Sequence, residues 1–172
     1  LVVAPTAVAR SVWKQEIMGW DHLKHLRVNV MLGSAVERRA ALRGIADVYV
    51  INYENLQWLE HECRGGKWPF RTVIADESTF LKSFRLKQGG ARAASLARFA
   101  HSCVRRWINL TGTPAENGLL DLWGQAWFLD EGKRLGASFT SFQERWFYRP
   151  ADGDESSRIL LPHRHANVEI RG

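Results

Sequence analysis

The chain is poor in cysteine and has no long apolar segment. Its 172 residues include two cysteines, Cys63 and Cys103, which is too few for the disulfide framework of a small secreted domain. No apolar run approaches the roughly 20 residues that a membrane-spanning helix needs. No charged-then-apolar leader opens the sequence either. We therefore expect a cytoplasmic protein with no membrane partner.

Acidic residues are absent from one long stretch of the chain. No aspartate or glutamate lies between Glu77 and Glu116. The same stretch holds seven basic residues, namely Lys82, Arg85, Lys87, Arg92, Arg98, Arg105 and Arg106. Charges of one sign make this stretch a candidate surface for phosphate groups. A solvated basic face with counter-ions is the alternative interpretation.

The net charge of +6 comes mostly from arginine, with 18 arginines against 6 lysines. Arginine suits phosphate recognition because its planar fork donates hydrogen bonds in pairs. A GC-rich genome would produce the same bias through codon usage, so composition alone leaves both explanations open.

Short apolar strands alternate with helical segments along the chain. Predicted strands cover residues 1–5, 27–32, 47–51, 72–75 and 107–110, and predicted helices cover 7–20, 35–42, 53–63, 88–101, 119–129 and 139–147. This alternation predicts an α/β fold with a mainly parallel sheet flanked by helices. The sequence becomes polar and turn-rich at residue 150, so we expect 150–172 to be a polar loop or tail.

Polar side chains follow four of the predicted strands, where parallel sheets bind their ligands. These residues are Thr6, Asn52, the pair Asp76-Glu77, and Thr111 with Thr113. Two adjacent carboxylates after a buried strand repel each other and favour a cation beside them. An aspartate in this position can hold magnesium through its water shell, and a neighbouring glutamate can deprotonate an attacking water. The pattern predicts a magnesium–nucleotide site, while ordinary loop polarity is the alternative.

Four segments resemble motifs of the Swi/Snf-type branch of helicase superfamily 2. Residues 1–16 resemble motif Ia, 49–56 motif Ib, 76–83 the Walker B motif, and 110–130 motif III with the helix after it. The most specific stretch contains Thr-Gly-Thr-Pro, Asn117 and Asp121-Leu122-Trp123. The likeness covers residues 1–148. Ser78-Thr79 stands in place of the usual Ala-His, and this departure resembles phage-encoded members.

The resemblance implies that residues 1–149 form an incomplete RecA-like lobe of the P-loop NTPase type. Such a lobe would be part of an ATP-dependent motor that moves on duplex DNA without regard to sequence, with ATP and Mg²⁺ as cofactors. The second RecA-like lobe of the same protein would be its partner, in a bacterial or phage-infected cell. Asp76 would hold Mg²⁺ through water and Glu77 would be the catalytic base. Thr111, Gly112 and Thr113 would couple the ATP site to DNA. Thr6 and the backbone near Asn52 would touch a DNA phosphate, and Lys82, Arg85 and Lys87 of the acid-free stretch would bind the same partner.

The sequence contains no GxxxxGK[ST] loop to cradle phosphates. In the family it resembles, this loop precedes motif Ia, so we expect a fragment that lacks upstream and downstream parts and is inactive alone. A non-catalytic DNA-binding or scaffold remnant that has lost the loop is the alternative. The intact Asp76-Glu77 pair and the Thr111–Pro114 stretch favour the motor.

Overall fold

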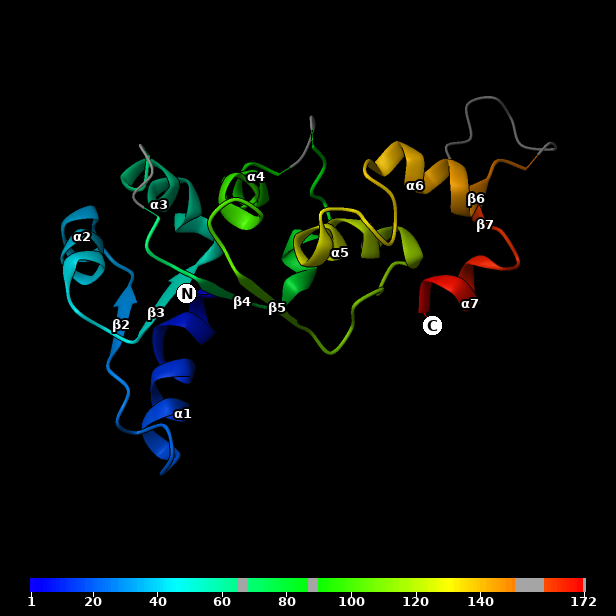
Figure 1. The fold of residues 1–172 in the computed structure, drawn as a ribbon. Coiled ribbons are helices and arrows are strands. Elements are labelled where there is room, and N and C mark those ends of the chain that lie inside the picture. Colours follow the sequence, from blue (N-terminus) through cyan, green and yellow to red (C-terminus); the bar gives the residue numbers. More distant parts are fainter. Residues whose placement is uncertain (65–67, 87–89, 151–159, 172) are drawn as a thin grey trace.

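The computed structural model describes residues 1–64, 68–86, 90–150 and 160–171 (Figure 1). Its five-stranded sheet has the order β2-β3-β1-β4-β5, and every neighbouring pair is parallel. The strands are β1 Val2–Ala4, β2 Val28–Met31, β3 Val48–Asn52, β4 Thr72–Asp76 and β5 Arg106–Leu110. The expected α/β fold with a parallel sheet is confirmed.

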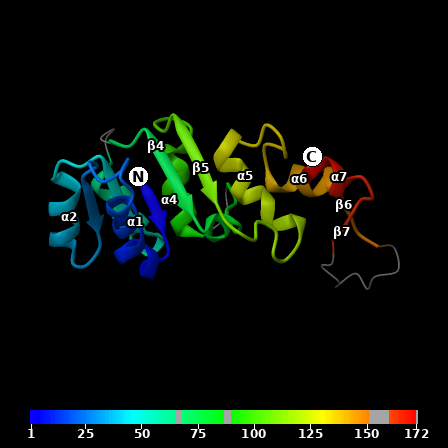
Figure 2. The same cartoon turned by 90° about the horizontal axis from the view of Figure 1, so that it is seen from below.

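Helices cover both faces of this sheet. On one face lie α2 Ala35–Arg43, α3 Leu56–Glu62, α4 Ala91–Ala100 and α5 Leu122–Asp130 (Figure 1). On the other face, the π-helical turn η1 Val8–Val12 continues into α1 Trp13–Gly19. Figure 2 shows this face, with α1 next to the visible strands β4 and β5. The 3-10 turns η2 Tyr53–Asn55 and η4 Leu119–Asp121 lead into α3 and α5. The predicted helices are present, although the proposed start of α4 at residues 88 and 89 lies outside the described residues.

Two apolar clusters fill the space between the sheet and its helices. The smaller cluster contains Val2, Ala4, Ala9 and Val50, on the α1 face. The larger cluster lies under α3, α4 and α5 and is rich in aromatic rings, which bury the most apolar area per residue. Trp123 and Trp127 of α5 belong to it.

Helix α5 lies unusually close to the 3-10 turn η3 Ser78–Leu81, which follows Glu77. A Cβ atom on Gly124 would lie 2.5 Å from the main-chain oxygen of Leu81 and 2.8 Å from that of Lys82. Glycine is therefore required for this approach. The contact holds the turn after β4 directly against the helix that follows β5.

The end of the chain has more structure than the sequence indicated. Helix α6 Phe139–Trp146 leads into an antiparallel pair, β6 Phe147–Tyr148 with β7 Leu161–Pro162, and then α7 Ala166–Arg171. We expected a polar loop or tail over 150–172. Its described part instead contains β7, which pairs with β6, and α7, whose first residue Ala166 is fully buried against the aromatic cluster. Among the described residues, none of the helices has the length and apolar composition that a membrane span requires.

Candidate functional site

The residues predicted after β4 and β5 lie side by side at one edge of the sheet. Asp76 ends β4 and is in register with Leu110, which ends β5. The two chains therefore leave the sheet together. The Thr111 hydroxyl donates to Glu77 Oε2 over 3.5 Å, at the long limit of a hydrogen bond. The Thr113 amide donates to the Thr111 hydroxyl at 3.2 Å, so the four predicted residues Asp76, Glu77, Thr111 and Thr113 lie together at the carboxyl edge.

The carboxylate of Asp76 is held in place from two directions. The indole Nε1 of Trp13 donates to Asp76 Oδ2 at 2.7 Å, and the Glu77 amide donates to Asp76 Oδ1 at 3.0 Å. Trp13 is partly buried. It packs on the smaller apolar cluster, but its polar edge reaches the site. Each carboxylate oxygen keeps a further lone pair for a water molecule or an ion.

Glu77 sits in a strained backbone conformation. Its φ of 52° and ψ of 57° are left-handed, which is uncommon and costly for a residue with a side chain. This turn sends the Glu77 side chain out to solvent, next to Thr111. Beneath it, the buried Tyr53 hydroxyl donates to the main-chain oxygen of Asp76 at 2.8 Å. Burial raises the pKa of Tyr53 well above its ordinary value, and the nearby Asp76 and Glu77 charges add to the rise.

The two carboxylates suit magnesium held through water. Among the described residues, neither Asp76 nor Glu77 forms an ion pair, so their negative charge is not compensated by a basic side chain. No group of three or more potential ligand residues is present there either. Mg²⁺ is usually bound through one or two carboxylates together with waters and substrate phosphates. The donor set therefore fits this ion, whereas the sequence supplies no GxxxxGK[ST] cradle for the phosphates.

Thr6 and Asn52, which follow β1 and end β3, form a separate polar chain at the same edge. The Thr6 hydroxyl donates to Glu54 Oε2 at 2.9 Å and accepts from Asn52 Nδ2 at 2.9 Å. Glu54 in turn pairs with Arg92 at 3.4 Å. Because the Asn52 side chain is buried and engaged, any contact with a ligand at this residue falls to the main chain.

Several basic residues of the acid-free stretch are engaged by other parts of the fold. Lys82 Nζ lies 3.5 Å from Asp121, and Arg98 lies 2.9 Å from Glu60. Arg85 stacks on the ring of Phe139, 3.3 Å from its centroid, and burial lowers its pKa. The stretch is thus of one sign in sequence but not in space.

The remaining basic residues of this stretch lie apart from the candidate edge or outside the description. Arg106 begins β5 opposite Thr72, at the amino end of the sheet, with Arg105 immediately before it. These two face away from the carboxyl edge. Lys87 lies outside the described residues.

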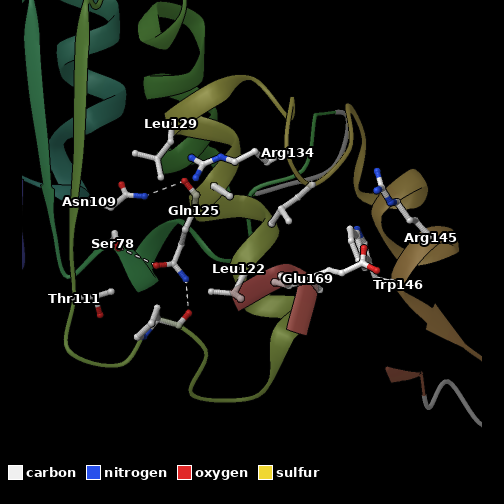
Figure 3. Close-up of a pocket in the computed structure, with 14 residues that line it drawn as sticks. Ser78, Asn109, Thr111, Leu122, Gln125, Leu129, Arg134, Arg145, Trp146 and Glu169 are labelled. Atoms are coloured by element: carbon white, nitrogen blue, oxygen red, sulfur yellow. Dashed lines mark hydrogen bonds between the residues drawn. The ribbon is translucent and has the colours of Figure 1, made fainter. Parts of the chain in front are cut away.

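A buried amide that the sequence did not single out links the two parts of the edge. The Ser78 hydroxyl donates to Gln125 Oε1 at 2.8 Å, and Gln125 Nε2 donates to the main-chain oxygen of Pro114 at 2.6 Å (Figure 3). Asn109 Nδ2 also donates to the Gln125 main-chain oxygen at 3.0 Å. These groups line a pocket of about 770 Å³ beside β5, together with Thr111.

The fold is of the class of parallel α/β sheets that bind ligands at the carboxyl ends of their strands, and the paired carboxylates lie at that edge. The comparisons with known proteins then give the family. The chain belongs to the SNF2-related domain family, whose model matches residues 1–165. The resemblance to the Swi/Snf-type branch that the motifs carried is confirmed.

Two relatives illustrate the range of this similarity. Protein p41 of Acyrthosiphon pisum secondary endosymbiont phage 1 is 55% identical over 172 residues, which cover 99% of this chain and 37% of p41. Helicase SWR1 of Kluyveromyces lactis is 30% identical over 164 residues, which cover 88% of this chain and 10% of that helicase. The chain thus spans little over a third of the one and a tenth of the other.

Among solved structures, the Sulfolobus solfataricus SWI2/SNF2 ATPase core in complex with dsDNA is similar in fold. Its TM-score is 0.63 at 25% identity, and the match covers 85% of this chain and 27% of that one. The proteins similar to this chain thus include a phage protein, a helicase and an ATPase core solved in complex with dsDNA.

Proposed function

We propose that residues 1–149 are part of the first RecA-like lobe of a longer protein that hydrolyses ATP to move along duplex DNA. The observation that carries this proposal is the pair Asp76 and Glu77. Both carboxylates stand at the carboxyl edge of a parallel sheet, with Thr111 beside them and no ion-pair partner in the described part of the chain. Family membership supports the same reading.

Each residue of this edge has a distinct role in the proposal. Bound Mg²⁺-ATP would supply the phosphoanhydride bond that is broken. Asp76, fixed by Trp13, would hold the ion through its water shell. Glu77 would orient the attacking water and accept its proton. Thr111, Gly112 and Thr113 would connect this chemistry to DNA, since Thr111 already touches Glu77.

Duplex DNA is the proposed partner, because the similar archaeal ATPase core was solved in complex with dsDNA. Thr6, the main chain at Asn52, and Lys82, Arg85 and Lys87 would contact phosphates. Phosphate contacts carry no sequence information, so binding would be independent of sequence. Lys82 would have to exchange Asp121 for a phosphate. A second RecA-like lobe of the same protein, in the cytoplasm of a bacterial or phage-infected cell, completes the proposal.

A non-catalytic DNA-binding or scaffold remnant of this fold is the second candidate. The observation in its favour is that residues 1–172 contain no GxxxxGK[ST] loop. Without backbone amides and a lysine around the β- and γ-phosphates, nucleotide would bind poorly. The two candidates therefore differ in whether the full-length gene product hydrolyses ATP.

Phosphate release by the full-length protein, measured with and without duplex DNA, separates these candidates. The motor should hydrolyse ATP, and duplexes of unrelated sequence should stimulate it equally. The stimulation should weaken as salt is raised, because phosphate contacts release counter-ions. The 172-residue chain alone should not turn ATP over. Absence of hydrolysis by the full-length protein on any duplex would instead favour the remnant.

A further inference from the structure

The buried side chain of Gln125 spans the two segments that carry the candidate site. Its amide group meets Ser78, which directly follows Glu77, and Pro114, which directly follows Thr113. In Figure 3, Gln125 extends from α5 toward both segments. Apart from this amide, the long contact between Thr111 and Glu77 at 3.5 Å also links them.

The hydrogen bonds fix the orientation of this amide. Its Nε2 points at two main-chain oxygens, of Pro114 at 2.6 Å and of Asp121 at 3.0 Å, which can only accept. Oε1 must therefore face Ser78, whose hydroxyl has to donate. Ser78 is 0% exposed and Gln125 is 4% exposed, so this hydrogen bond lies between buried groups. A buried polar group left without its partner is costly, and the link is correspondingly stiff.

The surrounding packing leaves little freedom for one segment to move without the other. Gly124 brings the α5 backbone against η3, with a Cβ position only 2.5 Å from Leu81 O. Asn109, near the end of β5, holds the main-chain oxygen of Gln125 at 3.0 Å. Displacement of the Thr111–Pro114 loop would therefore also displace η3, the turn that follows Glu77 and fixes its backbone conformation.

We propose that Gln125 is a positioning residue that transmits the state of the Thr111–Pro114 loop, through Ser78, to the turn carrying Glu77. This inference rests on the proposed function, because its readout is the response of ATP hydrolysis to DNA. Gln125 touches no reacting atom. Its role is to make the geometry at Glu77 depend on whether the loop is engaged.

The test is the stimulation ratio of the full-length protein, defined as the ATP hydrolysis rate with saturating duplex DNA divided by the rate without it. Ser78→Ala and Gln125→Leu should each lower the ratio by about fivefold, the equivalent of one ordinary hydrogen bond. The rate without DNA should stay close to that of the parent. The double variant should lose no more than either single variant, because both changes break the same link.

Ser95→Ala is the matched control. Ser95 is another buried serine, and its hydroxyl donates to Glu60 Oε2 at 2.7 Å, a bond between α4 and α3 that includes no residue of the Gln125 link. This variant should lose stability as Ser78→Ala does but keep the parent's ratio. If Gln125→Leu does not fold, Ser78→Ala carries the test, since it removes a single oxygen atom.

The outcomes separate the inference from the proposed function. A parent protein without ATP hydrolysis overturns the proposed function and the inference with it. A parent that is stimulated by DNA, with unchanged ratios in Ser78→Ala and Gln125→Leu, overturns the inference alone. An equal loss of ratio in Ser95→Ala also overturns it, because the effect would then follow stability rather than this link.

Discussion

At the scale of single residues, the candidate site rests on a phenol beneath two carboxylates. Tyr53 is fully buried, stacks on Phe80 with centroids 4.7 Å apart, and donates to the main-chain oxygen of Asp76. Burial, with the charges of Asp76 and Glu77, keeps its pKa above the ordinary 10.0. The phenol therefore stays neutral in the folded chain, where a phenolate would repel both carboxylates.

Tyr53→Phe should change how stability depends on alkaline pH. At pH 8 the variant should be about 1 kcal/mol less stable, the usual contribution of one hydrogen bond. Above pH 10 the unfolded parent releases the Tyr53 proton and the folded parent does not, so rising pH destabilises the parent through this group. The variant lacks that loss, so the difference in the free energy of unfolding between parent and variant should become smaller as the pH rises. Denaturant unfolding of the 172-residue chain between pH 8 and 11.5 measures this difference. A difference that stays constant over this pH range would contradict this account.

The residues that sequence reasoning found and missed differ in the distance to their partners along the chain. Asp76, Glu77 and Thr111 were predicted because each directly follows an apolar strand, which is a local signal. The roles proposed for them remain predictions. Trp13 and Gln125 were missed because their partners, Asp76 and Ser78, lie 63 and 47 residues away. Only the folded sheet brings those pairs together.

At the scale of elements, the buried parallel strands were the most predictable part of the fold. A strand that is buried on both faces is a short apolar run, which can be recognised in the sequence without knowledge of its neighbouring strands. The two-residue strands β6 and β7 and the helix α7 had no such signal. They depend on contacts such as the burial of Ala166 and the approach of the His165 and Trp146 rings, whose centroids lie 5.9 Å apart. Their pairing is visible only in three dimensions.

Gly124→Ala should destabilise the chain more than its small size indicates. The added methyl group would meet the Leu81 main-chain oxygen at 2.5 Å, and backbone cannot rotate away as a side chain can. Overpacking of this kind costs about 1–3 kcal/mol. Gly19→Ala is the control, because its Cβ would meet nothing within 4 Å and alanine is the better helix former. Equal denaturation midpoints for parent and Gly124→Ala would show that α5 does not approach η3 this closely.

At the scale of the whole molecule, charge is distributed differently in space than along the chain. The net charge of +6 and the acid-free stretch indicated a basic strip. In the fold, Lys82, Arg92 and Arg98 each pair with an acid from outside that stretch. Sequence spacing does not show such pairs, since their partners come from η2, α3 and η4. Any DNA surface must therefore draw on more than this one segment.

The central claim is that Glu77 at the carboxyl edge activates water for ATP hydrolysis, and Glu77→Gln in the full-length protein tests it most directly. Glutamine keeps the size and hydrogen bonding of the side chain but removes the base. Steady-state phosphate release on duplex DNA should fall about 100-fold or more, as expected when a positioned base is lost. Nucleotide binding should persist. Glu144→Gln, the same change at an exposed glutamate of α6, should behave as the parent does. Parent-like hydrolysis by Glu77→Gln would contradict the account.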